Sequence, residues 1–253
     1  MTGPAADWPL PLWIAHRGCG RLAPENTLAA FRLGASYGYR AFECDVKLSA
    51  DGVPFLLHDT LLDRTTPERG VAGERSWAEL SRIDAGGWHS RGFAGEPLPS
   101  LDAVARYVQR NDLALNIEIK PTPGHEQSTG HAVGLACLRL WRDTRPLPLL
   151  SSFHPEALAA AREAAPSMPR ALLVDTLWPG WLELAHSLGC VAVVSNYNLM
   201  DAALIARLHG APMRALCYTV NDPAEARRLV GLGIDGLITD AVDRFSPSAG
   251  VDD

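Results

Sequence analysis

Two pairs of charged residues in this 253-residue sequence have the two-residue spacing that places side chains on the same face of a strand. Glu43 and Asp45 lie in one apolar run, and Glu118 and Lys120 lie in another. Three carboxylates in apolar surroundings are costly to bury without a cation, and an all-oxygen ligand set favours Mg²⁺ or Ca²⁺. Glu43, Asp45 and Glu118 are therefore candidate ligands of one divalent cation. Salt bridges to Arg or Lys neighbours, including a Glu118–Lys120 ion pair, are the structural alternative.

Histidine and cationic side chains supply the complementary chemistry. His16 and Arg17 end the first apolar run, and His58 closes a short run after the second. Arg17 offers a bidentate guanidinium for phosphate oxygens, and Lys120 offers a compact positive charge. His16 and His58 can each take or give a proton near neutral pH, although a single histidine at a strand end is more often structural. With a metal ion, this set indicates acid–base cleavage of a phosphate ester.

Alternating strand and helix patterns provide the frame for these residues. Apolar runs rich in Val, Ile, Leu and Phe predict eight buried parallel strands, namely Leu12–His16, Ala41–Leu48, Leu113–Lys120, Leu147–Phe153, Ala171–Asp175, Val191–Asn196, Arg214–Val220 and Gly236–Asp240. Their number and the chain length favour an α/β fold of the closed (β/α)8 type, the TIM barrel, over an open doubly wound sheet. In such a barrel the carboxyl ends of the strands meet at one mouth, where the charged residues would gather.

Polar residues mark where several helices begin. Asn26 or Thr27 would cap a helix that carries Leu28, Phe31 and Ala35 at helical spacing. Ser100 precedes Leu101, Val104 and Val108 in the same way, and Asp222-Pro223 with Glu225 forms a cap followed by a first-turn proline.

One segment interrupts the alternation. Val53–Leu57 follows Asp51-Gly52 and predicts a hairpin return after the second strand. Residues 59–100 are too many for an ordinary loop and predict a small insertion with short elements of its own. We expect a single domain over residues 12–246 that includes this insertion, with terminal tails at 1–11 and 247–253.

Composition excludes several classes of protein. The chain has 47% hydrophobic residues, a formal net charge of −6 and no dense Lys/Arg run, so we expect no nucleic-acid partner. No apolar run reaches about 18 residues, and residues 1–11 do not resemble a signal peptide, so we expect no stable membrane association. Five cysteines without CxxC spacing indicate free thiols and a cytoplasmic location. The sequence indicates no particular oligomeric state.

The remaining histidines and two tryptophans have simpler interpretations. We interpret the other six histidines as surface, cap or packing residues: His89, His125, His131, His154, His186 and His209. Trp178 and Trp181 favour loop packing over a place at a substrate rim.

Ordered motifs over residues 12–245 resemble the glycerophosphodiester phosphodiesterase family, especially its short cytoplasmic bacterial members. The matching segments are Ala15-His16-Arg17-Gly18, Ala23-Pro24-Glu25-Asn26-Thr27, Glu43-Cys44-Asp45-Val46, Leu57-His58-Asp59, Asp63-Arg64-Thr65, Pro97-Leu98-Pro99-Ser100-Leu101, Asn116-Ile117-Glu118-Ile119-Lys120-Pro121, Leu150-Ser151-Ser152-Phe153, Tyr218-Thr219-Val220-Asn221 and Ile238-Thr239-Asp240. At Tyr218, many members of the family carry Trp.

The resemblance implies hydrolysis of glycerophosphodiesters, such as glycerophosphocholine and glycerophosphoethanolamine, to sn-glycerol 3-phosphate and an alcohol. The matched roles are metal ligation by Glu43, Asp45 and Glu118, acid–base catalysis by His16 and His58, phosphate contact by Arg17 and Lys120, and orientation by Glu25 and Asn26. The implied route passes through a cyclic phosphate formed by the glycerol 2-hydroxyl. Direct attack by water, the order in which the histidines act, the choice between Mg²⁺ and Ca²⁺ and the head-group preference stay open.

Two other functions compete with this interpretation. A relative with a similar barrel would cleave lysophospholipids or sphingomyelin at a membrane, but we expect neither the signal peptide nor the disulfides of secreted relatives, and no stretch reads as a basic amphipathic surface helix. A catalytically silent protein would bind glycerophosphodiesters with the same pocket, but every matched position keeps the residue that catalysis needs.

Overall fold

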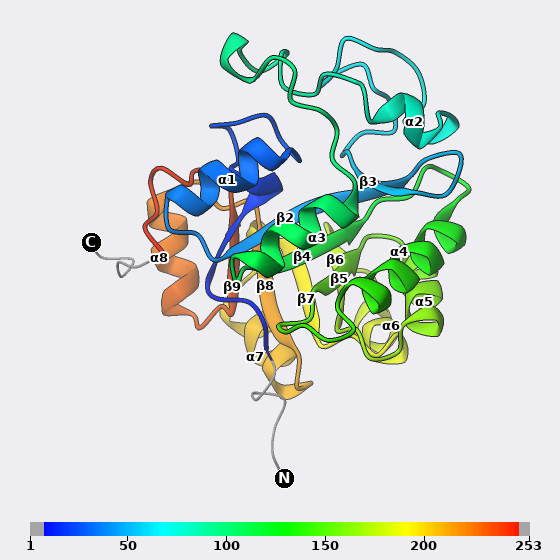
Figure 1. Cartoon of the computed structure of the whole chain (residues 1–253). Helices are drawn as coiled ribbons and strands as arrows, with labels where there is room; N and C mark the ends of the chain where they lie inside the picture. Colours follow the sequence, from blue (N-terminus) through cyan, green and yellow to red (C-terminus); the bar gives the residue numbers. More distant parts are fainter. Residues whose placement is uncertain (1–7, 248–253) are drawn as a thin grey trace.

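The computed structural model describes residues 8–247, and its centre is a closed barrel of eight parallel strands (Figure 1). These strands are β1 (Trp13–Ala15), β2 (Ala41–Leu48), β4 (Ala114–Ile119), β5 (Leu149–Ser152), β6 (Arg170–Val174), β7 (Ala192–Asn196), β8 (Arg214–Tyr218) and β9 (Gly236–Thr239). The pairing of β1 with both β9 and β2 closes the ring. The predicted TIM barrel is confirmed, and the open sheet is excluded.

Helices alternate with the strands and cover the outside of the barrel (Figure 1). They are α1 (Leu28–Ser36), α3 (Leu101–Arg110), α4 (Glu126–Leu140), α5 (Pro155–Ala164), α6 (Trp181–Ser187), α7 (Ala202–Gly210) and α8 (Pro223–Gly231). Three predicted caps are confirmed: the side chains of Thr27, Ser100 and Asp222 accept hydrogen bonds from the first-turn amides of α1, α3 and α8. None of the helices in residues 8–247 is long and apolar enough to cross a bilayer.

The interior of the barrel changes from apolar to charged along the strands. Its apolar part contains Ile14, Ala41, Ala114, Leu149 and Ile238 among other buried side chains. Along β2, Glu43, Asp45 and Lys47 follow Ala41 at two-residue intervals, while the residues between them join the core beneath the helices. The alternation of a strand thus carries the charged residues to the carboxyl-terminal mouth.

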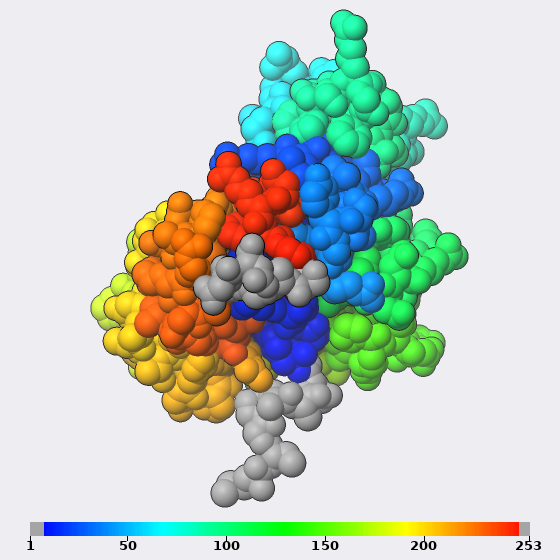
Figure 2. Space-filling view, turned by 90° about the vertical axis from the view of Figure 1, so that its left-hand side faces the viewer, coloured from blue at the N-terminus to red at the C-terminus, as the bar shows by residue number. Residues whose placement is uncertain are grey.

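The predicted hairpin and insertion follow the second strand. Strand β3 (Pro54–Leu56) pairs antiparallel with β2, as expected for Val53–Leu57. The chain from 59 to 100 contains η2 (Ala72–Glu74), α2 (Trp77–Leu80) and η3 (Arg91–Phe93), and it packs around a small core of its own with Leu62 and Leu80 fully buried. Figure 2 shows this segment, coloured cyan to green, projecting at one end of the molecule.

The structure describes only part of the two predicted tails, namely residues 8–11 and residue 247. Residues 1–7 and 248–253 lie outside the described residues. Within the predicted amino-terminal tail, Leu10 is buried in the apolar interior of the barrel, with Trp8 packed against that cluster.

Candidate active site

Three carboxylates from β2 and β4 meet inside the mouth of the barrel. Residues Asp45 and Glu118 are register partners on these adjacent strands. One oxygen from each of Glu43, Asp45 and Glu118 lies within 4.8 Å of the other two, and all three side chains are buried. The two-residue spacing places Glu43 and Asp45 on one face of β2, and the pairing of β2 with β4 brings Glu118 beside them, so the three predicted ligands do lie together.

Two cations flank the carboxylates. Lys120 Nζ lies 2.8 Å from Glu118 Oε1 and 3.5 Å from Asp45 Oδ1. Arg17 Nε lies 3.3 Å from Asp45 Oδ2, and the backbone N–H of Arg17 donates to Glu43 at 3.1 Å. Arg17 has a left-handed backbone, φ 50° and ψ 32°, which is uncommon for a residue other than glycine. A hydrogen bond from the Asn26 N–H to the Arg17 carbonyl stabilises this turn.

His16 is held by an aspartate from the other end of the chain. His16 Nδ1 lies 2.6 Å from Asp240 Oδ1, and the Asn221 amide donates to the other oxygen of Asp240 at 3.2 Å. The Nε2 atom of His16 lies 3.7 Å from Glu43 Oε2. The backbone at Gly20 lies so close to the backbone of Asp240 that a Cβ at position 20 would clash with it.

His58 has a parallel arrangement at the start of the insertion. Its Nδ1 atom lies 2.7 Å from Oδ1 of Asp59, the next residue. Asp59 accepts two hydrogen bonds from the Arg64 guanidinium, from Nε at 2.7 Å and from Nη2 at 3.0 Å. Each histidine thus has one ring nitrogen bound to an aspartate and the other left for a different partner.

Glu25 and Asn26 contact the charged groups from the loop before α1. The Asn26 amide donates to Asp45 Oδ2 at 2.8 Å, and its carbonyl oxygen accepts from the Asp45 N–H at 3.0 Å. Glu25 accepts from Arg17 Nη1 at 2.9 Å. Neither side chain is part of the carboxylate cluster, and both fix residues that flank or form it.

Burial and neighbouring charges shift the pKa values of the three carboxyls in different directions. Burial, with the nearby Asp45, raises the pKa of Glu43 to about 8. Burial and Asp45 also raise the pKa of Glu118. Burial opposes ionisation of Asp45 as well, but Arg17 and Lys120 hold its pKa well below the usual range.

The pKa values of the two histidines are also shifted in opposite directions. Burial disfavours the charged form of His16, but its hydrogen bond to Asp240 and the nearby Glu43 carboxylate together raise its pKa. Burial lowers the pKa of His58, because the cations Arg17 and Lys120 offset much of the attraction of Asp45.

The carboxylate cluster fits a hard divalent cation. Its donors are oxygens alone, which is the ligand type that Mg²⁺ and Ca²⁺ prefer. Glu43 Oε1 is buried without a hydrogen-bond partner in the described residues. An unpaired buried carboxylate oxygen beside two other carboxylates is costly, and a cation would remove that cost.

A cavity of about 290 Å³ joins these groups. It is lined by His16, Arg17, Glu43, His58, Glu118 and Lys120, with aromatic walls from Phe153 and Tyr218. Phe153 and Tyr218 contact each other edge to face, and the Tyr218 hydroxyl donates to the Val174 carbonyl at 3.2 Å.

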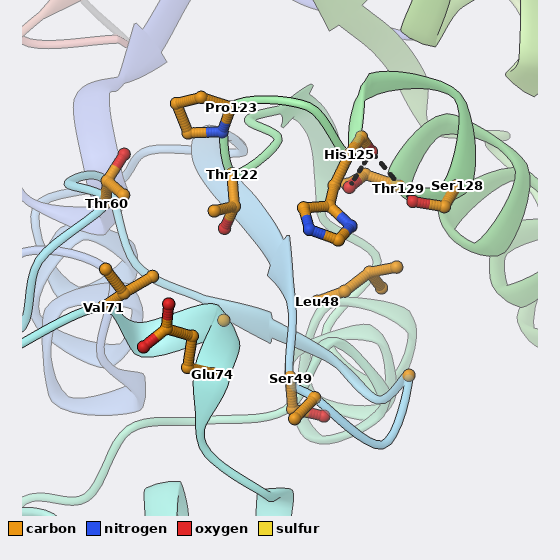
Figure 3. A pocket seen from close by; sticks show the side chains of 13 residues that line it. Leu48, Ser49, Thr60, Val71, Glu74, Thr122, Pro123, His125, Ser128 and Thr129 are labelled. Carbon is orange, nitrogen blue, oxygen red and sulfur yellow. Dashed lines mark hydrogen bonds between the residues drawn. The ribbon is translucent and has the colours of Figure 1, made fainter.

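A larger cavity of about 560 Å³ lies between the end of β2, the insertion and the amino-terminal end of α4 (Figure 3). His125 and Glu74 point into it, but the hydroxyls of Ser128 and Thr129 donate to the His125 carbonyl instead of facing a ligand. It contains no cluster of buried charged groups, so the chemistry belongs to the smaller cavity.

Some site residues were not predicted from the sequence as functional. Asp240, Asn221 and Arg64 belong to matched motifs but had no assigned role, and only the folded structure shows what their side chains contact. Lys47 is buried and donates from Nζ to the Lys120 carbonyl at 3.0 Å, and burial lowers its pKa to about 8. The two-residue spacing from Asp45 was a signal for Lys47.

The six other histidines and both tryptophans lie outside the smaller cavity. His209 pairs with Asp235 at 2.8 Å, and His89 packs edge-on against Trp88 and Phe93. Trp181 begins helix α6 and does not lie in a loop as predicted, but it is buried beneath Arg207, which agrees with packing. Trp178 is 37% exposed.

Comparisons with known proteins agree with this geometry. The model of the glycerophosphoryl diester phosphodiesterase family matches residues 16–244. A glycerophosphodiester phosphodiesterase of Caldanaerobacter subterraneus is 30% identical over 90% of this chain and 93% of its own length. The phosphodiesterase of Oleispira antarctica, solved with the product sn-glycerol-3-phosphate, is 32% identical with a TM-score of 0.86, covering 93% of this chain and 95% of that one.

A glycerophosphodiester phosphodiesterase structure from Agrobacterium tumefaciens is 28% identical with a TM-score of 0.77 and covers 94% of this chain and 99% of that one. The region matched by the family model contains every residue of the cavity described above and every strand of the barrel except β1. The chain therefore belongs to the glycerophosphoryl diester phosphodiesterase family and is an enzyme of that class.

Proposed function

We propose that this enzyme hydrolyses water-soluble glycerophosphodiesters, such as glycerophosphocholine and glycerophosphoethanolamine, to sn-glycerol 3-phosphate and an alcohol. One observation carries the proposal: a single cavity is lined by Glu43 and Glu118 of the carboxylate cluster, by two cations and by two histidines that are each held by an aspartate. The similar Oleispira antarctica enzyme, which binds sn-glycerol 3-phosphate, supports the choice of product.

Glu43, Asp45 and Glu118 would hold one divalent cation, Mg²⁺ or Ca²⁺. When bound, such an ion polarises the phosphoryl group and neutralises charge that develops on its oxygens. The donor set and the unpaired oxygen of Glu43 support this assignment.

Arg17 and Lys120 would contact the non-bridging phosphate oxygens. Both side chains line the cavity, and their pairing with the carboxylates fixes their positions before a substrate arrives. A charge held in place by the protein stabilises the transition state without a cost of reorganisation during the reaction. Glu25 would hold the Arg17 guanidinium in position, and Asn26 would hold the Asp45 carboxylate in position.

His16 and His58 would transfer the protons. One histidine takes the proton of the glycerol 2-hydroxyl, whose oxygen attacks phosphorus. The bond from phosphorus to the departing alcohol breaks, and the other histidine protonates that alcohol. Water then attacks phosphorus of the cyclic phosphate with the two roles reversed, the bond from phosphorus to the 2-oxygen breaks, and sn-glycerol 3-phosphate is released. The adjacent hydroxyl has a high effective concentration at phosphorus, which favours this route over direct attack by water.

The decisive experiment measures products of glycerophosphocholine after treatment with EDTA and after restoring Mg²⁺ or Ca²⁺. We expect sn-glycerol 3-phosphate and choline, activity lost with EDTA, and recovery with one of the two ions. Release of phosphocholine and glycerol instead would place the cleavage at the other P–O bond. No product with either ion would contradict the proposal, and lysophospholipid substrates and then binding without turnover would be measured next.

The cyclic route has its own test. A substrate analogue without the 2-hydroxyl cannot form the cyclic phosphate, so we expect its turnover to fall to the background. Turnover at the rate of the parent substrate would instead support direct attack by water.

We also infer a reducing compartment, the cytoplasm, as the site of action. All five cysteines lie within the described residues, and each is buried as a free thiol. Buried free thiols in this number are typical of proteins that fold in reducing conditions.

A further inference from the structure

Arg64 connects two parts of the active site without lining its cavity. Both edges of its guanidinium are occupied. On one edge, Nη1 and Nη2 donate to the two oxygens of Glu25 at 2.7 and 2.8 Å. On the other edge, Nε and Nη2 donate to the two oxygens of Asp59 at 2.7 and 3.0 Å. Arg64 thus holds two carboxylates at once.

Each of these carboxylates holds a group that lines the cavity. Glu25 accepts from Arg17 Nη1 at 2.9 Å, and Asp59 lies 2.7 Å from His58 Nδ1. The result is a chain of alternating charge that runs Arg17–Glu25–Arg64–Asp59–His58. Its two ends come from different parts of the fold, because Arg17 and Glu25 lie between β1 and α1, whereas residues 58–64 begin the insertion.

We propose that Arg64 is a positioning residue that fixes Arg17 and His58 relative to each other through Glu25 and Asp59. This inference rests on the proposed function, in which Arg17 contacts the phosphate and His58 transfers a proton. Reacting groups that shift by about 1 Å can lose about 10²-fold in rate. One residue that holds both groups at once therefore affects both substrate binding and turnover.

The contact geometry requires arginine. Four donated hydrogen bonds leave from three nitrogens of one planar group, and each carboxylate is bound through both oxygens. Lysine has a single nitrogen and cannot reproduce this planar arrangement. Arg64 is 43% exposed, whereas Glu25 is only 13% exposed. The guanidinium is thus accessible to solvent from its outer side.

The backbone around Arg64 is anchored independently of the guanidinium. Leu62 is fully buried in the core of the insertion, and its N–H donates to the Gly70 carbonyl at 3.0 Å. The Thr66 hydroxyl donates to the Leu62 carbonyl at 2.8 Å. We therefore expect Arg64→Ala to fold, with its effects confined to the side chains that Arg64 contacts.

The first test compares the kinetics of Arg64→Ala with those of Arg69→Ala. Arg69 lies in the same segment and pairs with Asp63 at 3.0 Å, but it is 82% exposed and contacts no residue of the cavity. For Arg64→Ala we expect a rise in KM, a fall in kcat and a loss of about 10- to 100-fold in kcat/KM. We expect Arg69→Ala to keep both constants.

Rescue separates positioning from a loss of structure. Guanidinium chloride at low millimolar concentration should restore part of the activity of Arg64→Ala, because the vacated site is open to solvent. Sodium chloride at the same concentration should not do so, and Arg64→Lys should recover only part of the lost kcat/KM.

Two double-mutant cycles test whether Arg64 acts through Asp59 and Glu25. Asp59→Asn should lower kcat, Glu25→Gln should raise KM, and either change combined with Arg64→Ala should cost less than the sum of the single effects. Additive effects in both cycles, or wild-type kcat and KM for Arg64→Ala, would overturn the inference. An inactive wild-type enzyme would instead mean that the proposed function has failed, so the two failures are distinguishable.

Discussion

His16 and His58 have the same hydrogen-bonding arrangement but different electrostatic surroundings. In each, an aspartate binds Nδ1, so that the ring orientation is fixed and Nε2 remains for proton transfer. The nearby carboxylates favour the charged form of His16, whereas burial and two cations disfavour it for His58. Two imidazoles with opposite tendencies suit a reaction in which one group takes a proton while the other gives one.

Removing either imidazole should therefore slow the chemical step. We expect His16→Ala and His58→Ala each to lower kcat by about 10²- to 10⁴-fold, as measured by release of sn-glycerol 3-phosphate. His125→Ala serves as the control, because this exposed histidine lines the larger cavity shown in Figure 3 and not the cavity that contains His16 and His58. Near-wild-type kcat in either active-site variant would remove that histidine from proton transfer.

At the residue scale, the sequence predicts contacts that local geometry determines and misses those that chain closure creates. The spacing of Glu43 and Asp45 follows from the alternation of one strand, so their shared orientation was predictable. Asp240 is 224 residues from His16 and meets it only because β9 pairs with β1. No local pattern carries that information.

Among the elements, Asp235 joins a helix to two successive strands. It lies just before β9, accepts from the Ala215 N–H in β8 at 2.8 Å, and bonds His209 of α7 and Arg214 of β8. Burial alone would raise the pKa of Asp235, but these hydrogen bonds lower it. A carboxyl with a lower pKa in the folded state stabilises the fold when it is ionised.

This stabilisation should depend on pH in one direction. It is fully present above the unfolded-state pKa of about 3.9 and is lost as pH falls through the lower folded-state value. We expect Asp235→Asn to lower the free energy of unfolding by about 1–2 kcal/mol at pH 7, less than a fully buried network because His209 is partly exposed.

Urea unfolding at pH 7 and at pH 3 measures this difference. The gap between wild type and Asp235→Asn should narrow at the lower pH, whereas Asp143→Asn, at an exposed position, should change little at either. A gap of equal size at both pH values would show that the ionised carboxylate contributes nothing.

Element boundaries show which signals a sequence carries. The caps Thr27, Ser100 and Asp222 are found where polar residues precede a helical period, because capping depends on the first turn alone. Helix α2 was not predicted, although Ser76 and Glu79 form a capping box there. With four residues it is too short for an apolar period to appear.

For the whole molecule, the ring of strands converts a local pattern into one charged interior. The number of strands favoured a barrel, but only the β1–β2 pairing distinguishes a closed ring from an open sheet. Inside this ring, the adjacent strands β2 and β4 place Glu43, Asp45 and Glu118 in a small volume that excludes most water, where like charges repel strongly. The stability of the whole fold should therefore depend on the ion that compensates them.

Metal removal should lower the melting temperature. A ligand that binds only the folded state adds about 2.7 kcal/mol at 100 times its Kd, which for a chain of this size corresponds to about 5–10 °C. We expect a shift of this size when saturating Mg²⁺ or Ca²⁺ is added to EDTA-treated protein, as measured by calorimetry.

The variant Glu43→Gln should lose stabilisation by the ion without losing stability in the metal-free state. It removes one ligand, so the shift caused by the ion should shrink or vanish. It also replaces a buried carboxyl whose ionised form is disfavoured by burial and by Asp45, so the metal-free variant should melt at or above the temperature of the metal-free wild type. An unchanged shift in Glu43→Gln would mean that the ion binds elsewhere, and a metal-free variant much less stable than wild type would mean that Glu43 is stabilised by the protein itself.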